Sequence, residues 1–321
     1  MKLGVLTVPL QEQSAEDAFR YLSGLGVETV ELGAGCYTNG NHLQREAILA
    51  DPQKAEALKA LLKKYDLQIS ALSCHGNPVH PQKEIAEHDH KVFEETVLVA
   101  EMLGVDTIVT FSGCPGDSAG SLYPNWVTCA WPPDYGKILD YQWNEVLIPY
   151  WKKAVKFAND HGIYKIALEL HPGFSCYNTA SLLRLREAVG DTIGANFDPS
   201  HLFWQGMDPV ASIRALKGAI HHFHAKDTKI DPYNNAVNGV LDTGSYDDLG
   251  NRSWTFRTIG YGHDMGVWKD IMSALRSAGY DGAISIEHED AYMSTAEGLE
   301  KAIAFLKEVI IKEQPAEMWW A

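Results

Sequence analysis

Acids and histidines stand at the ends of four short apolar runs in the second half of the chain. These runs read KIALELHPG, IGANFDPSH, IHHFHAKD and AISIEHED, and they end around Glu169, Asp198, His224 and Glu287, respectively. A parallel strand that is covered on both faces is apolar along its length, so charge confined to its end lies at the rim of a sheet. Four rims with the same pattern predict one shared site.

Three carboxylates and one imidazole suit a hard or borderline divalent cation, whereas structural zinc sites prefer cysteine and histidine. We therefore predict that Glu169, Asp198, His224 and Glu287 bind one divalent ion, with Mn²⁺ as the first choice and Mg²⁺ or Co²⁺ as alternatives. Such an ion would polarise a substrate carbonyl and acidify the neighbouring C–H group. For each acid taken alone, an ordinary ion pair at the rim is the alternative.

The elements that must position these residues alternate along the whole chain. Strands are expected near 3–8, 29–34, 68–74, 106–112, 165–170, 193–198, 220–225 and 283–287. Helices are expected near 14–25, 53–65, 84–103, 140–161, 179–189, 208–217, 266–278 and 294–312. Eight such alternations predict an α/β protein with a single (β/α)8 TIM barrel domain over 1–321. A doubly wound sheet is the rival, but TVPLQEQ after the first strand lacks its glycine fingerprint.

Two connections are too long to be simple turns, namely 114–144 after the fourth strand and 228–265 after the seventh. Long connections are usually functional or disordered, and loops that follow barrel strands lie on the active-site face. Trp126 and Trp131 in the first of these loops are expected to wall a substrate pocket, because flat aromatic faces suit sugar rings or aromatic groups. Packing of the loop against the barrel is the alternative for each tryptophan.

Composition indicates where the protein is located in the cell and which classes of partner it can bind. A net charge of −15 argues against nucleic acid, which needs clustered lysine and arginine. No apolar run approaches the ~20 residues that span a membrane, the N-terminus lacks a signal-peptide cleavage site, and five cysteines lack paired spacing. We therefore expect a cytoplasmic protein with no membrane partner. The tryptophan pair in the tail PAEMWWA is expected to pack against a second subunit, which favours a homo-oligomer, with packing under the barrel as the alternative.

These motifs resemble the xylose-isomerase-like barrel superfamily, and within it the group of sugar phosphate isomerases and epimerases. The resemblance covers nearly the whole chain and rests on LELHPG, NFDPSHLFWQG, HFHAKDT and SIEHED. In ketose epimerases of this group, the equivalents of the four predicted ligands bind one divalent ion. The resemblance further implies that Glu169 and Glu287 act as an acid–base pair on opposite faces of the substrate, and that His201 binds a substrate oxygen.

The chain departs from the ketose epimerases at two places. Those enzymes carry another glutamate six residues after the first metal-binding glutamate, where this chain has Ser175, with His171 nearer by. The longer loop after the seventh strand contains NRSWTFRTIGYGHD, which resembles proteins that act on keto-glycosides, including 3-oxo-glycoside epimerases and the barrel subunit of C-glycoside-cleaving enzymes. The substrates implied by the resemblance therefore include keto-glycosides as well as free ketoses.

Further residues are candidates through their positions. His171 follows the first ligand by two residues and points the same way along a strand, so it is expected to be catalytic or to orient that ligand. Lys226 has the same relation to the histidine ligand. It is expected either to stabilise an enediolate oxygen or to pair with Asp198 or Glu287. The other candidate substrate contacts are His75, Arg257 and His263.

The predicted activity is that of a divalent-metal-dependent sugar isomerase or epimerase. It would remove a proton next to a metal-bound carbonyl of a ketose or keto-glycoside, through an enediolate. The alternative is a 3-oxo-glycoside lyase or C-glycoside deglycosidase subunit that uses the same chemistry, in some cases with a smaller partner subunit. A DNA-repair endonuclease on this barrel would need more histidines and a basic groove. The four intact ligands argue against a metal-free binding protein.

Overall fold

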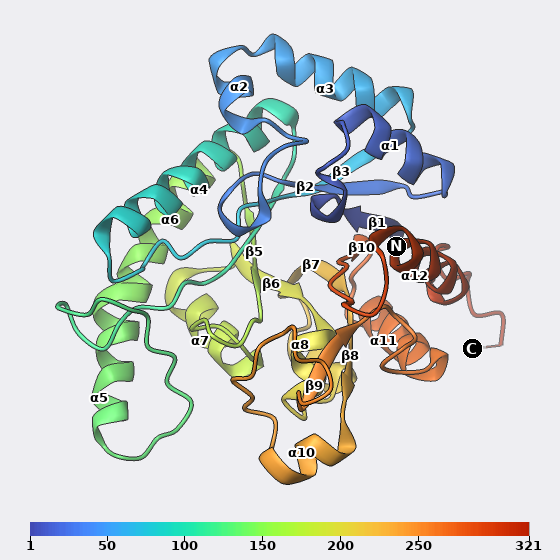
Figure 1. Ribbon diagram of the computed structural model, residues 1–321. Helices are drawn as coiled ribbons and strands as arrows, with labels where there is room; N and C mark the ends of the chain where they lie inside the picture. The colour runs from blue at the N-terminus through green and yellow to red at the C-terminus, as the bar shows by residue number, and fades with distance from the viewer. Residues whose placement is uncertain (321) are drawn as a thin grey trace.

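Eight parallel strands close into a barrel in the computed structural model, which describes residues 1–320 (Figure 1). The strands are β1 (Lys2–Leu6), β2 (Thr29–Gly33), β3 (Gln68–Ser73), β4 (Thr107–Thr110), β5 (Lys165–Glu169), β6 (Ile193–Phe197), β7 (Ile220–Ala225) and β10 (Ala283–Ile286). They follow one another around the barrel in chain order, and β10 closes it by pairing with β1. The predicted (β/α)8 barrel is confirmed, and each predicted strand overlaps one observed strand.

Eight helices follow these strands in turn and cover the outside of the barrel (Figure 1). They are α1 (Ala15–Gly24), α3 (Gln53–Lys64), α4 (Lys83–Leu103), α6 (Ile148–Asp160), α7 (Thr179–Val189), α9 (Pro209–Ala215), α11 (Met265–Ser277) and α12 (Thr295–Val309). Shorter helices in the connections are α2 (Arg45–Ala50), α5 (Asp134–Asp140), α8 (Pro199–Trp204) and α10 (Pro232–Asn238), with 3₁₀ turns η1 (Val8–Leu10) and η2 (Cys36–Thr38). Within residues 1–320, every helix is too short or too polar to cross a lipid bilayer.

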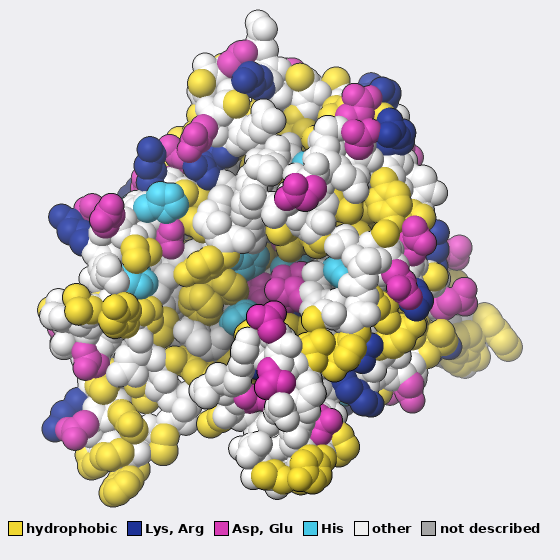
Figure 2. Space-filling view, viewed as in Figure 1, with side chains coloured by type: hydrophobic (Ala, Val, Ile, Leu, Met, Phe, Trp, Pro, Cys, Tyr) yellow, Lys and Arg dark blue, Asp and Glu magenta, His cyan; other side chains and the backbone are white. Residues whose placement is uncertain are grey.

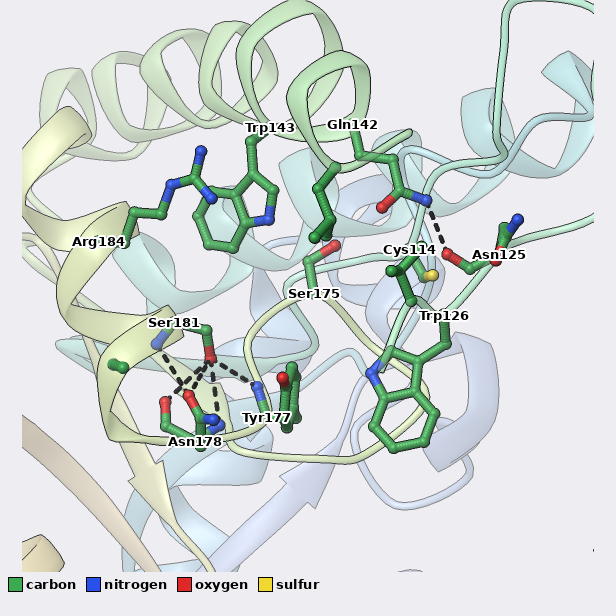
Figure 3. Close-up of a pocket in the computed structure, with 13 residues that line it drawn as sticks. Cys114, Asn125, Trp126, Gln142, Trp143, Ser175, Tyr177, Asn178, Ser181 and Arg184 are labelled. Atoms are coloured by element: carbon green, nitrogen blue, oxygen red, sulfur yellow. Dashed lines mark hydrogen bonds between the residues drawn. The ribbon is translucent and has the colours of Figure 1, made fainter. Parts of the chain in front are cut away.

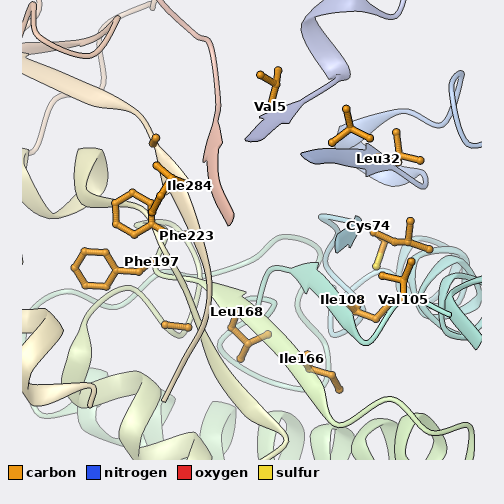
Figure 4. Close-up of a cluster of buried hydrophobic side chains, with 14 of the residues drawn as sticks. Val5, Leu32, Cys74, Val105, Ile108, Ile166, Leu168, Phe197, Phe223 and Ile284 are labelled. Carbon is orange, nitrogen blue, oxygen red and sulfur yellow. The ribbon is translucent and has the colours of Figure 1, made fainter. Parts of the chain in front are cut away.

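The alternation of side chains along each strand separates an outer core from a barrel interior. Leu168 on β5 points outward with Ile166 into the large core between strands and helices, as Figure 4 shows for the strand residues that it labels. Ala167, between them, belongs instead to a small inner cluster with Ala71 and Val109. Because side chains alternate with period two, Glu169 at the end of β5 points inward like Ala167.

The long connection after β7 contains structure that the sequence did not predict. Strands β8 (Asp227–Ile230) and β9 (Trp254–Arg257) form an antiparallel pair, and α10 lies between them in the chain. The Asp227 carboxylate accepts hydrogen bonds from the backbone N–H groups of Gly260, Gly262 and His263, at 2.9 to 3.1 Å. These bonds join the two ends of the connection at its base.

Gly33, the last residue of β2, allows η2 to fold back against the strand end. A Cβ atom there would overlap the backbone carbonyl oxygens of Thr38 and Asn39, whereas a Cβ at Gly24, at the end of α1, meets open space. We expect Gly33→Ala to lower the free energy of unfolding by about 1–3 kcal/mol, because backbone must move. The matched change Gly24→Ala should be neutral or slightly stabilising. Thermal unfolding of both variants tests this, and equal Tm values would contradict it.

Candidate active site

The four predicted metal ligands lie together at the carboxyl ends of β5, β6, β7 and β10. Glu169 is the last residue of β5, His224 lies within β7, and Asp198 and Glu287 directly follow β6 and β10. Each contributes a ligand atom to a cluster in which these atoms all lie within 4.8 Å of one another. The sequence pattern brings these four together because the carboxyl ends of all parallel barrel strands meet at one face.

Two atoms of this cluster support a cation at its centre. Nδ1 of His224 and Oδ2 of Asp198 are buried and make no hydrogen bond with residues 1–320, although Oδ2 forms an ion pair with Lys226. The same Nδ1 lies 3.2 Å from Oε2 of Glu287 and 3.4 Å from Oε2 of Glu169. Buried polar atoms without a partner are costly, and each exception calls for an explanation. A divalent ion among these four side chains would satisfy both atoms, so the residues fit the predicted group.

Lys226 places a positive charge in the same cluster. Its Nζ lies 2.7 Å from Oε2 of Glu287, 2.9 Å from Oε2 of Glu289 and 3.1 Å from Oδ2 of Asp198. Burial lowers the pKa of Lys226, but the charges of Asp198, Glu287 and Glu289 outweigh burial and raise that pKa well above its usual value. The ion-pair alternative for this lysine is therefore realised with both predicted carboxylates, and the ammonium also reaches the cavity described below.

Glu169 is held by side chains from the loop after β3, from β6 and from α8. Nε2 of His75 lies 2.9 Å from its Oε2, Nε2 of His201 lies 3.0 Å from its Oε1, and Nδ2 of Asn196 donates to Oε2 at 3.3 Å. Burial raises the pKa of Glu169, but the hydrogen bonds from His201 and His75, together with the nearby His224 ring, outweigh it and leave that pKa well below normal. Burial, with the nearby charge of Lys226, lowers the pKa of His201 to about 3, so its ring is neutral.

Glu31 on β2 is a site residue that the sequence analysis missed. Both of its carboxylate oxygens lie 3.0 Å from Nε2 of His224, and Ser285 donates a hydrogen bond to it at 2.7 Å. Burial opposes its ionisation, but the charges of His224 and His222 outweigh burial and lower the pKa of Glu31 to about 2. Glu31 thus fixes the His224 ring with Nδ1 toward the cluster. The available signal was one acid inside the otherwise apolar strand TVELG.

A cavity of about 150 Å³ borders the cluster on the face shown in Figure 2, where acidic and histidine side chains lie in a central hollow. Five predicted site residues line it: His75, Glu169, His171, Lys226 and Glu287. Six further lining residues were not predicted as site residues: Leu6, Val8, Tyr37, Thr38, Phe111 and Glu289. His171 is half-buried, its Nδ1 lies 2.6 Å from the carbonyl oxygen of Pro172, and its ring centroid lies 4.1 Å from that of His201.

Two predicted substrate contacts, Arg257 and His263, instead support the loop after β7. Nε of Arg257 lies 3.1 Å from Oδ2 of Asp290, and its guanidinium lies over the ring of Tyr292. Nδ1 of His263 lies 2.7 Å from Oδ1 of Asp227. Neither residue is among those that line the cavity in the described chain. Their partners lie in or beside the same loop, which the local sequence pattern did not reveal.

The two predicted tryptophan walls also lie elsewhere. The side chain of Trp131 is 75% exposed and is not among the residues that line either cavity in the described chain. Trp126 lines a separate cavity of about 260 Å³ between the loop after β4 and α7, shown in Figure 3. This second cavity is larger than the one at the barrel mouth, but only the smaller one borders the converging carboxylates and imidazoles. We therefore assign the candidate active site to the smaller cavity.

Comparisons with known proteins agree with this barrel. A family model described as "Xylose isomerase-like TIM barrel" matches residues 19–309. The Bacillus subtilis (strain 168) protein described as "Uncharacterized protein YfiH" is 39% identical over 312 residues, which are 97% of this chain and 99% of that protein.

Three solved structures share the fold at low sequence identity. The probable 3-DHS dehydratase AsbF from Bacillus anthracis has a TM-score of 0.65 at 19% identity, covering 96% of this chain and 99% of that one. A D-tagatose 3-epimerase-like protein has a TM-score of 0.63 at 20% identity, covering 96% and 98%. The IOLI protein with a bound zinc atom has a TM-score of 0.65 at 16% identity, covering 96% of each chain.

Replacing Glu31 with Gln tests its role behind His224. The change keeps the size of the side chain but removes the charge that orients the imidazole, so we expect divalent-ion affinity to fall about 10–100-fold. The exposed Glu308, on α12, provides a matched Glu308→Gln control that should bind ions normally. Calorimetric titration with Mn²⁺ measures the affinity, and circular dichroism checks folding. Unchanged affinity in Glu31→Gln would remove Glu31 from the site.

Ion binding should also depend on pH. Burial and the charges of Glu169 and Glu287 outweigh the effect of Lys226 and raise the pKa of Asp198 to about 7. The carboxylates of Glu31 and Glu287 overcome burial and raise the pKa of His224 well above normal. An incoming cation must therefore displace protons, and affinity should fall as pH decreases below about 7, by roughly tenfold per unit for each proton displaced. Titrations at pH 6 and pH 8 in buffers of different ionisation enthalpy measure this release, and pH-independent affinity would contradict it.

Proposed function

Because the chain belongs to the xylose isomerase-like TIM barrel family, we propose that it is a divalent-metal-dependent sugar isomerase or epimerase. The reaction would remove a proton from the carbon next to the carbonyl of a ketose or keto-glycoside. The observation that carries this proposal is the pair of carboxylates, Glu169 and Glu287, which border one cavity beside the buried ligand cluster. The epimerase-like neighbour supports the reaction class, and the zinc-bound neighbour supports a divalent ion.

The proposed ion belongs among Glu169, Asp198, His224 and Glu287. When bound there, it would supply Lewis-acid polarisation of the substrate carbonyl. Mn²⁺ is the first choice because three of the four ligands are carboxylates, and Mg²⁺ and Co²⁺ suit the same donors. Lys226 would add a second positive charge beside the reacting carbonyl, since its ammonium group lines the cavity.

The two glutamates would move the protons. β6 and β7 separate β5 from β10 in the barrel wall, so Glu169 and Glu287 reach the cavity from different sides. Burial opposes ionisation of Glu287, but the charges of Lys226 and His224 lower its pKa well below normal. Both glutamates are therefore ionised and able to accept a proton. One would remove the proton from carbon, and the other, after taking up a proton from solvent, would deliver that proton to the opposite face of an epimerase substrate.

His171 is the third proposed acid–base group. It lines the cavity, and burial lowers its pKa below the usual value, so its imidazole is neutral near pH 7. A neutral ring accepts or donates a proton without first releasing one to solvent. His171 would replace one glutamate when the substrate is a bulkier glycoside. His75 and His201 would mainly hold Glu169 in place, because each contacts one of its oxygens.

A lyase on 3-oxo-glycosides is the alternative. It would begin with the same proton removal, but a group on the neighbouring carbon would then leave instead of a proton being returned. The fold is shared with a probable dehydratase as well as with an epimerase-like protein, so it supports both outcomes. Under this alternative, His171 would accept the proton from carbon and then donate it to the leaving group. Product analysis separates the two: an epimerase yields an isomer of equal mass, and a lyase yields two fragments or an unsaturated product.

Exchange of hydrogen with solvent tests the proposed chemistry. A panel of free ketoses and 3-keto-glycosides in D₂O should include a substrate that gains deuterium at the carbon next to the carbonyl. We expect Glu169→Gln to slow this exchange by about 10²–10⁴-fold, the usual contribution of a positioned base. Glu308→Gln, far from the cavity in the chain, should exchange normally. Nuclear magnetic resonance and mass spectrometry follow the label.

Metal removal provides the second arm of that experiment. Chelator-treated protein should lose the exchange, and Mn²⁺ should restore it. Turnover that incorporates no label and requires a hydride acceptor would rule out the proposed proton removal. Full exchange in the chelated protein would instead rule out dependence on a divalent ion.

A further inference from the structure

The second cavity, beside α7, has the properties of a binding site in its own right. It shares no lining residue with the cavity at the barrel mouth. Its walls come from the loop after β4, from the end of α5 and the helical turn after it, and from α7 with the loop that precedes it. Its volume of about 260 Å³ lies just below the usual range for drug-sized ligands, so it suits a smaller molecule.

Aromatic rings form much of its wall. The rings of Trp126 and Tyr177 meet edge to face with centroids 5.4 Å apart, and Trp143 lines the cavity from the opposite element (Figure 3). The indole nitrogen of Trp126 is buried and has no hydrogen-bond partner within residues 1–320. A buried indole N–H normally finds an acceptor, and an oxygen atom of a bound molecule would supply one.

Arg184 gives the cavity a single positive charge. Its guanidinium carbon lies 4.1 Å from the centroid of the Trp143 ring, which leaves the edge of the guanidinium free for hydrogen bonds. This side chain is exposed, and in the described part of the chain its contact is with the Trp143 ring rather than with a carboxylate, although the protein carries a net charge of −15. The lining residues include no carboxylate. A planar guanidinium of this kind matches a carboxylate through two parallel hydrogen bonds.

An unusual backbone segment holds this wall. Residues Tyr141–Leu147 form a π-helical turn, η3, which carries Gln142 and Trp143. Nε2 of Gln142 donates to the carbonyl oxygens of Pro115, Gly116 and Asn125, at 3.2, 3.2 and 2.7 Å, and so fixes the loop that carries Trp126. π-Helical turns are rare and occur frequently at functional sites. Here the turn places the aromatic and polar walls around the same space.

We propose that this cavity binds a small aromatic carboxylate. Its flat ring would lie against the aromatic walls, and its carboxylate group would bind Arg184. The aromatic walls select a flat ring, the guanidinium selects the anion, and the absence of acids in the lining avoids repulsion. This binding site is separate from the cavity of the proposed isomerase reaction, so ligand binding here does not depend on which substrate binds at the barrel mouth.

Calorimetric titration of the metal-loaded protein with benzoate tests the proposal. Benzoate should bind saturably at one site per chain, whereas benzamide, which lacks the charge, and acetate, which lacks the ring, should bind at least about tenfold more weakly. Arg184→Gln should weaken benzoate binding by about tenfold or more, and Trp126→Phe by several-fold, because it removes the N–H donor and part of the aromatic wall. Quenching of tryptophan fluorescence provides an independent measure.

Two controls locate the site. Arg214, on α9, is an exposed arginine outside the cavity, so Arg214→Gln should leave benzoate affinity unchanged. Glu169→Gln alters the cavity at the barrel mouth and should also leave it unchanged. Absence of saturable binding, equal affinity for benzamide, or full affinity in Arg184→Gln would overturn the proposal. Loss of benzoate binding in Glu169→Gln would assign the ligand to the other cavity and overturn it as well.

Discussion

Several carboxylates packed into the buried mouth of a barrel repel one another and lose their hydration, and the site depends on how these costs are offset. Burial of a charge is tolerated when the charge is paired and fully hydrogen-bonded. The protein meets this requirement with Lys226 among three carboxylates and with His224 between Glu31 and Glu287. Nδ1 of His224 and Oδ2 of Asp198 still lack a hydrogen-bond partner in residues 1–320, so protein groups alone do not satisfy every buried polar atom of the site.

This requirement shapes the inside of the barrel. Lower in the barrel, Ala71, Val109 and Ala167 fill the interior with small apolar side chains. Above them, inward positions carry polar groups that bond between strands, as in the contact of 3.1 Å between Asn196 on β6 and His222 on the adjacent strand β7. The large apolar core lies outside the strands, beneath the helices. Stability and chemistry are thus assigned to opposite faces of the same strands.

Features that depend on local sequence pattern and on strand order were predicted well from the sequence. Strand positions follow from apolar runs, and ligands at strand ends meet because a parallel barrel brings those ends together, which is why Glu169, Asp198, His224 and Glu287 were placed correctly. Glu31 was missed because its partner is almost two hundred positions away, in contact only through closure of the barrel.

Loop residues were the harder part. Tyr37 and Thr38 reach the cavity only because η2 folds back over the end of β2, a path that no periodicity indicates. Arg257 and His263 have the chemistry of substrate-binding groups, but nearby acids in the same region engage them first. Trp126 does line a cavity, but the fold of its loop decides which one.

The hydrogen bonds of Asp227 bear on how proteins with this barrel diversify. The backbone N–H of His263 reaches the Asp227 carboxylate across 36 positions of sequence, so the whole connection leaves and rejoins the barrel at one anchored point. Lys226 precedes that anchor directly and is held by carboxylates at the strand ends, with the ring of Phe256 on β9 also 4.6 Å from its Nζ. Insertions, deletions and exchanges between β8 and β9 can therefore accumulate without displacing the reactive centre. Natural or engineered changes in this segment could therefore alter which molecules reach the cavity at the barrel mouth.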